Sequence, residues 1–201
     1  MPTAVTQAIT TLAEAEQLLG ITRSEDPASF MEWQQSLPTL TATEQSALDE
    51  LHRRYLYQRS EGHLLEGTVT LLFASPLLTV AGFYDPPFKL RAEVPVELVI
   101  NDGEETLQGR IDVLVLKNYL WVVVLESKKT TLSAWSALPQ TLAYLTANPD
   151  RPSFGLLTNG DDIIFVKLSS SQYTLSRVFA PLVTRQDLYG VMQVLKRLTD
   201  V

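Results

Sequence analysis

The sequence contains no cysteine, and this absence excludes disulfide bonds and thiolate metal sites. It contains only two histidines, His52 and His63, which are too few for a histidine-rich metal site. A role in the surface or the core is the more common one for such residues, so we assign neither a function.

Long apolar runs are also missing. The longest, residues 71–83, is interrupted by Pro76 and is shorter than the ~20 residues that cross a bilayer. The first residues lack the basic region of a signal peptide, and the sequence has neither internal repeats nor a Walker A motif. We therefore expect a single cytoplasmic domain with no membrane segment.

Two runs of apolar and β-branched residues, 109–116 and 119–126, predict the strands of a β-hairpin. Each run carries one carboxylate, Asp112 in the first and Glu126 at the end of the second. A pair of carboxylates on neighbouring strands is a candidate site for a divalent metal.

The turn decides whether these carboxylates meet. A three-residue turn with Asn118 at positive φ would pair Lys117 with Trp121 and bring Asp112 opposite Glu126. A two-residue turn at Lys117 and Asn118 would offset the carboxylates by three positions, on opposite faces, unless a bulge restored the register.

Lys128 follows Glu126 by two residues and so projects from the same side of the strand, whereas Ser127 points away and offers only its backbone carbonyl. Carboxylates and a carbonyl are ligands that Mg²⁺ prefers, and a nearby ammonium group can orient a water molecule. A plainer interpretation is that these charges are solvated strand ends. Against it stands the apolar run 121–125, which predicts a buried strand leading directly into them.

This pattern resembles the PD-(D/E)xK, or restriction-endonuclease-like, superfamily, and more narrowly the N-terminal nuclease domain of type I restriction motor subunits. The Asp112 strand and the Glu126-x-Lys128 strand match the motif, although Ile111 replaces the proline that gives the superfamily its name. Gln140 and Tyr144 resemble its Gln-x-x-x-Tyr signature on the following helix.

Further parts of the chain extend the resemblance over residues 61–168. Segment 66–78 is similar to the first core helix of the family, which makes Glu66 its expected carboxylate, with Glu61 as the competitor. Segments 154–160 and 163–167 are similar to its closing hairpin.

The resemblance implies a DNA nuclease that uses Mg²⁺ or Mn²⁺, present as the nuclease module alone, with a homodimer as one possible assembly. It implies catalytic roles for Asp112, Glu126, Lys128, Gln140 and Glu66. The expected metal ligands are Asp112, Glu126, Glu66 and the carbonyl of Ser127, and the expected nucleic-acid contacts are Lys129, Arg110, Lys117 and Tyr144.

The net charge of −7 is unfavourable for binding DNA. Residues 1–66 hold 10 acidic and 4 basic residues, whereas residues 67–201 hold 13 and 12, so the acidic excess lies upstream of the motifs. We expect weak, salt-sensitive binding to DNA, unless the downstream bases form only an ordinary mixed surface. Of the 12 downstream bases, those expected to meet a phosphate backbone are Lys89, Arg91, Arg110, Lys117, Lys128, Lys129 and Arg151.

The predicted fold is α/β, with a restriction-endonuclease-like core over residues 61–201 and a helical extension over residues 1–60 packed on it. The core order is a helix, a three-stranded antiparallel meander, a helix and two further strands. The expected helices are 6–19, 27–36 and 43–58 in the extension, then 66–78, 133–147 with Pro139 as a kink or a restart, and 186–198.

Two alternatives to an active nuclease stay open. One is a nuclease fold that no longer cuts and instead binds nucleic acid or a protein partner. The other is an interaction module in which the same elements serve only core and dimer packing. The interaction module predicts no affinity for Mg²⁺ or Mn²⁺ that is lost on Asp112→Ala.

Overall fold

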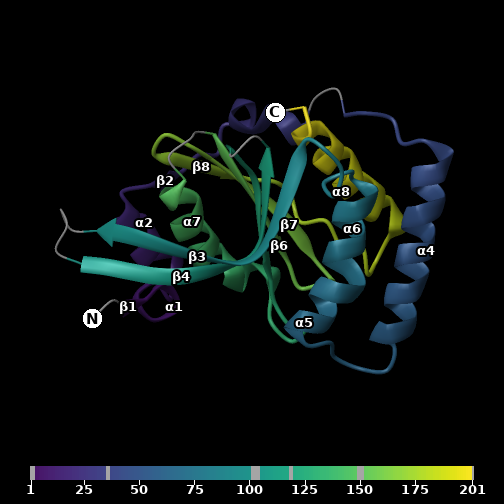
Figure 1. The fold of residues 1–201 in the computed structure, drawn as a ribbon, viewed down its shortest axis with the longest axis horizontal. Coiled ribbons are helices and arrows are strands. Elements are labelled where there is room, and N and C mark those ends of the chain that lie inside the picture. The colour runs from purple at the N-terminus through teal and green to yellow at the C-terminus, as the bar shows by residue number, and fades with distance from the viewer. Residues whose placement is uncertain (1–2, 35–36, 101–104, 118–119, 149–151, 201) are drawn as a thin grey trace.

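The computed structural model of the 201-residue chain describes residues 3–34, 37–100, 105–117, 120–148 and 152–200. It has one mixed β-sheet with helices on both faces (Figure 1). The strand order is β1-β4-β5-β6-β7-β8-β2, with β3 paired to the other edge of β4. The predicted α/β class is confirmed.

The predicted meander and closing hairpin are both present. β3, β4 and β5 pair antiparallel in sequence, β6 adds parallel to β5, and β7 returns antiparallel to β6. The strands are β1 (Thr3–Ala4), β2 (Thr22–Arg23), β3 (Phe88–Ile100), β4 (Glu105–Lys117), β5 (Leu120–Ser127), β6 (Ser153–Thr158), β7 (Ile163–Ser169) and β8 (Gln172–Leu175).

The register of the β4–β5 hairpin differs from the predicted one near the turn. Lys117 pairs with Leu120 and not with Trp121. The register then shifts by one residue between Val115 and Leu116, which is the bulge that a shorter turn requires. The predicted turn conformation at Asn118 falls on residues 118–119, outside the described part of the chain.

Beyond the bulge, Val113 pairs with Leu125, so Asp112 lies opposite Glu126 one step further along the two strands. The carboxylates therefore meet by a different turn from the one favoured by the sequence. The bulge has restored the register that a tight turn alone would have lost.

The helices begin where the sequence supplies caps. Thr11 and Thr41 each form a capping box with the glutamate three residues later, and Thr11 splits the predicted helix 6–19 in two. The helical elements are α1 (Val5–Ala8), α2 (Leu12–Leu19), η1 (Pro27–Phe30), α3 (Met31–Gln34), α4 (Ala42–Arg59), α5 (Glu66–Val69), η2 (Thr70–Ala74), α6 (Ser75–Val80), η4 (Ala134–Ala137), α7 (Leu138–Ala147) and α8 (Arg185–Leu198). Pro139 lies in the first turn of α7, so the predicted helix 133–147 restarts there.

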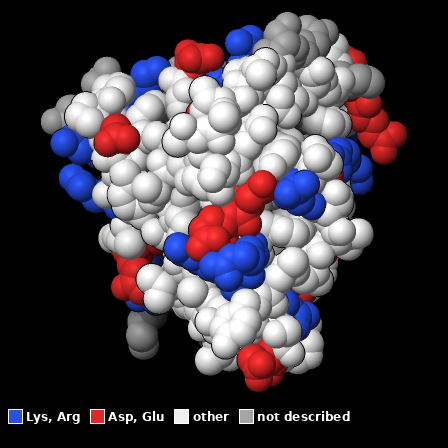
Figure 2. Space-filling view, turned by 90° about the vertical axis from the view of Figure 1, so that its right-hand side faces the viewer, with Lys and Arg blue, Asp and Glu red and all other residues white. Residues whose placement is uncertain are grey.

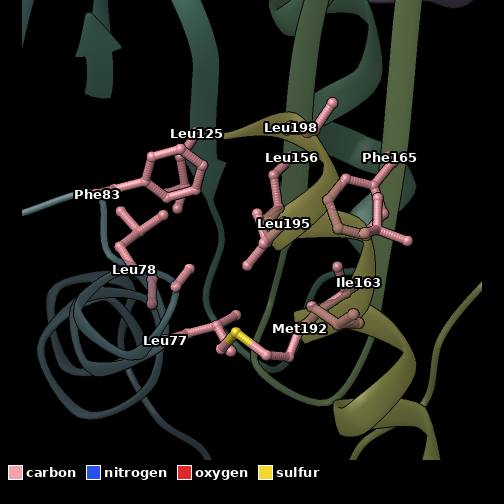
Figure 3. Close-up of a cluster of buried hydrophobic side chains, with 14 of the residues drawn as sticks. Leu77, Leu78, Phe83, Leu125, Leu156, Ile163, Phe165, Met192, Leu195 and Leu198 are labelled. Carbon is pink, nitrogen blue, oxygen red and sulfur yellow. The ribbon is translucent and has the colours of Figure 1, made fainter. Parts of the chain in front are cut away.

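Apolar side chains form a core on each face of the sheet. On one face, α6 and α8 pack against β5, β6 and β7 (Figure 3). On the other face, α7 packs against the sheet and α2 packs on α7. Burial on both sides agrees with β6, which is buried along its whole length and has no charged residue. No described helix combines the length and apolar surface that a bilayer span requires.

The N-terminal 60 residues are not the purely helical extension that we predicted. β1 pairs in parallel with β4, and β2 pairs in parallel with β8, so this segment contributes strands to the sheet. Each of these strands has two residues, which is too short for any alternation pattern. Residues 35–36 of the predicted helix 27–36 lie outside the described residues.

Candidate active site

The candidate site lies along one edge of β4, in a gap between two neighbouring strands. β1 pairs with β4 as far as Gln108, and β5 begins to pair at Val113. Between them, the Arg110 backbone N–H donates to the Tyr144 hydroxyl at 3.0 Å. Beside residues 109–112 of β4, side chains therefore take the place where the backbone of a neighbouring strand would pair.

Gly109 allows Tyr144 to approach this gap. A Cβ at position 109 would lie 2.5 Å from the Tyr144 ring, so any other residue would displace the aromatic side chain. An isolated glycine inside a predicted strand is a signal of close backbone approach, and this signal was available in the sequence.

Asp112 is held by the residue that follows Glu126. Its Oδ2 accepts hydrogen bonds from the backbone N–H of Ser127 at 2.8 Å and from the Ser127 hydroxyl at 3.0 Å. The same hydroxyl lies 2.8 Å from the Thr70 hydroxyl on η2. The prediction that Ser127 offers only its carbonyl is therefore wrong, because its side chain bridges Asp112 to the helical face of the site.

Glu126 is fully buried, and its carboxylate is only partly satisfied. Its Oε1 lies 3.4 Å from the Asp112 backbone N–H, whereas its Oε2 has no hydrogen-bond partner among the described residues. Burial raises the pKa of Glu126 well above its usual value, and the negative charge of Asp112 adds to this effect. The positive charge of Lys128 opposes it, with its Nζ 3.9 Å from Oε2.

A buried carboxylate oxygen without a partner fits a bound cation. Asp112 and Glu126 are hard oxygen donors, which suits Mg²⁺ or Mn²⁺. Within the described residues, no three Asp, Glu or His side chains come close enough together to hold a metal ion by themselves. Backbone and water oxygens would complete such a site, as Mg²⁺ usually requires.

A chain of hydrogen bonds positions Lys128. Its Nζ donates to Gln140 Oε1 at 3.4 Å, and Gln140 Nε2 donates to the Tyr144 hydroxyl at 2.8 Å. Gln140 and Tyr144 are one turn apart on α7, as the motif spacing implies. Only 1% of the Tyr144 surface is exposed, although Tyr144 lines the pocket, and its predicted contact with nucleic acid stays a prediction. Its hydroxyl links Gln140 to the backbone of β4.

Glu66 begins α5 on the opposite wall of the site. It lines the same pocket, of about 440 Å³, as Asp112, Lys128 and Gln140. Its negative charge also contributes to the raised pKa of Glu126. Glu61 lies in the turn after α4 and is not among the residues that line this pocket, so the geometry favours Glu66 as the helix carboxylate.

The basic residues predicted to contact DNA are not all close to this pocket. Arg110 lines it and is exposed, with Glu93 3.5 Å away. Lys129 is exposed directly after Lys128. Lys117 lies at the far end of β4, where its Nζ donates to the carbonyl of Thr199. Of the predicted contacts, Arg110 lines the pocket whereas Lys129 and Lys117 do not, and Arg151 lies outside the described residues.

The face formed by α4 shows a mixture of charges and no basic patch (Figure 2). Arg53 and Arg54 both pair with Glu50, and Arg185 pairs with Asp49. Because each of these arginines has an acidic partner, this face has no surplus of positive charge to attract phosphate.

Comparison with known proteins identifies the family. A family model described as the type I restriction enzyme R protein N terminus matches residues 25–174, which is more than half of the chain. The chain belongs to this family. The match begins earlier than residue 61, where the motif resemblance starts, and so includes α4 and the core helices that follow it.

Among solved structures, the chain is similar to a fragment of a putative HsdR subunit of a type I restriction enzyme from Vibrio vulnificus YJ016. The TM-score is 0.46 and the sequence identity 20%, over 69% of this chain and 26% of that chain. The chain thus spans about a quarter of the length of that structure. No curated protein matches the chain.

Proposed function

We propose that this domain is a divalent-metal-dependent nuclease that hydrolyses phosphodiester bonds of DNA. The observation that carries the proposal is the convergence of Asp112, Glu126 and Lys128 at the gap in the sheet. There Glu126 Oε2 is buried without a hydrogen-bond partner in the part of the chain that the structure describes. Membership of the type I restriction R-protein family supports a nuclease role for the domain.

The residues that would hold the metal are Asp112, Glu126 and the Ser127 carbonyl, with Glu66 on the opposite wall. When bound, a divalent ion supplies a Lewis acid for the phosphodiester and lowers the pKa of a coordinated water. Its charge would also stabilise the ionised form of Glu126, which burial and Asp112 disfavour.

The chain itself contributes positioning and charge. Ser127 fixes the carboxylate of Asp112 through two hydrogen bonds. Gln140 holds the Lys128 ammonium beside Glu126, where it can orient the attacking water and stabilise negative charge on the reacting phosphate. We expect Arg110, which lines the pocket, and Lys129, which is exposed and follows Lys128 in the chain, to meet the phosphate backbone.

The test is a cleavage assay on supercoiled, linear and single-stranded DNA in Mg²⁺, Mn²⁺ or EDTA. We expect cutting only with metal, and we expect Asp112→Ala and Lys128→Ala to lower it by at least about 100-fold, the usual scale for loss of an acid–base or electrostatic group. Asp200→Asn is the matched control, because Asp200 is exposed after α8. Equal cutting by wild type and both site variants would identify a contaminating enzyme and contradict the proposal.

Glu66 and Glu61 form a second matched pair in the same assay. Glu66→Gln removes a carboxylate from the pocket wall and should reduce cutting, whereas Glu61→Gln changes an exposed turn and should not. If no preparation cuts but metal-dependent DNA binding is measured, the domain is instead a nuclease fold that only binds.

A further inference from the structure

A second hollow lies beside the candidate active site and shares its residues. It has a volume of about 580 Å³ and lies between α5, η2 and α6 on one side and β3 and β4 on the other. Glu66, Arg110 and Asp112 line both this hollow and the active-site pocket. The two spaces therefore meet at Asp112. The volume of the second hollow is in the ~300–1,000 Å³ range of small-ligand sites.

An irregularity in β3 shapes this hollow. Glu93 is a non-glycine residue with φ 53° in the middle of the strand, and it is skipped between the pairs that Ala92 and Val94 make with β4. Ala92 and Glu93 both line the hollow at this irregularity. The register places Glu93 opposite Asp112, so the irregularity is at the site itself.

The walls of the hollow are partly apolar and carry one aromatic ring. Leu71, Leu90, Ala92 and Val113 line it. Tyr84 also lines it with 48% of its surface exposed, and the Tyr84 hydroxyl lies 2.8 Å from the Ser75 hydroxyl on α6. This hydrogen bond restrains the ring while leaving a large part of it accessible.

We infer that this hollow receives the base of an unpaired nucleotide next to the phosphate that is cut, with Tyr84 as the stacking partner. The inference rests on the proposed function and names its substrate class, which is DNA with single-stranded character at the cleavage position. Three features favour this occupant: aliphatic walls, an accessible restrained ring, and continuity with the site at Asp112. Bases stacked within a duplex present only their edges in the grooves and could not enter it.

The test measures binding of a single-stranded oligonucleotide carrying 2-aminopurine and of its blunt duplex, with Ca²⁺ in place of Mg²⁺. We expect Tyr84→Ala to weaken binding of the single strand about fivefold or more, the low end of the loss of one base–aromatic stack. Duplex binding should not change, and Tyr84→Phe, which keeps the ring, should retain most of the single-strand affinity. Tyr57→Ala is the matched control, because Tyr57 is exposed on α4 and does not line the hollow.

The outcomes separate this inference from the proposed function. Equal binding by wild type and Tyr84→Ala, or an equal loss for single strand and duplex, overturns the stacking role. Wild-type protein that cuts DNA but binds only the duplex also overturns it and leaves the nuclease proposal intact. Failure of wild type both to bind and to cut overturns the two together.

Discussion

Glu126 is the residue whose proposed role as a metal ligand conflicts most clearly with the stability of the folded protein. Its side chain is fully buried at the end of β5, and one carboxylate oxygen has no hydrogen-bond partner from any described residue. An ionised group in this environment destabilises the folded state unless a cation compensates it. The cost in stability can be measured, because glutamine has nearly the same shape as glutamate but carries no charge.

We predict that Glu126→Gln raises the free energy of unfolding at pH 7 without metal by about 1–3 kcal/mol, the usual cost of leaving a buried polar group unpaired. The folded-state pKa of Glu126 lies above its unfolded value of 4.5. The stability that its protonation contributes is therefore fully present below pH 4.5 and is lost as the pH rises through the folded pKa. Denaturant unfolding of both proteins across this pH range measures the difference.

Added Mg²⁺ should reverse the order of stability. A metal bound by Glu126 stabilises only the wild-type protein, because an amide is a weaker ligand than a carboxylate. A variant that is less stable than wild type at pH 7 without metal would show that Glu126 is well compensated by Lys128 alone.

The sequence predicted which site residues share one side of the β4–β5 hairpin. It did not predict the contacts that depend on how distant elements pack against the hairpin. Asp112, Glu126 and Lys128 share a side because alternation and register are local properties. The role of the Ser127 hydroxyl depends on where η2 packs. Lys117, five residues beyond Asp112 along β4, is about 17 Å away by strand geometry, and its predicted nucleic-acid role stays a prediction.

At the scale of elements, α4 is attached to the sheet by a buried polar network. The Tyr55 hydroxyl donates to Asp161 at 2.7 Å, and Arg59 donates to both oxygens of the same carboxylate. Asp161 lies in the turn between β6 and β7, and Thr158 at the start of that turn accepts a hydrogen bond from the Lys128 backbone N–H. The network thus joins α4 to the turn beside the site.

We predict that Asp161→Asn lowers the free energy of unfolding by about 1–3 kcal/mol, because it removes the charge that satisfies Arg59 in a largely buried position. Glu50→Gln is the matched control on the exposed side of α4, where Arg53 and Arg54 can turn to solvent. Thermal or denaturant unfolding compares the two. Equal effects would mean that the network does not anchor α4.

Elements with strong local signals matched their predictions, and weakly encoded ones did not. α4 and α8 begin within one residue of the positions that their caps and periodicity predict. β1 and β2 were missed because a strand of two residues has no recognisable sequence pattern. These residues are extended because they pair with the edges of β4 and β8. The meander was recognised because its strands are long.

At the scale of the whole molecule, the net charge of −7 opposes any approach to DNA. Glu66, Asp112 and Glu93 line the hollow in which the cut strand would lie. Binding should therefore depend on divalent cations even when no cleavage occurs.

We predict that replacing EDTA with Ca²⁺ strengthens binding of DNA at least about tenfold at low salt, because the ion compensates the carboxylates at the site. Added NaCl should weaken the complex through its contacts with phosphate. Fluorescence anisotropy with labelled DNA measures both effects. Asp112→Ala should reduce the Ca²⁺ response, and an unchanged affinity in EDTA would place the DNA elsewhere on the surface.

The position of β1 has a practical consequence for handling the protein. Ala4 and Thr6 line the active-site pocket, so a purification tag joined ahead of Thr3 would emerge at the rim of the space that receives substrate. The end of α8 lies on another part of the molecule (Figure 1). A tag fused after that helix leaves the pocket unobstructed, and activity lost with an amino-terminal tag and recovered on its removal would be blockage rather than misfolding.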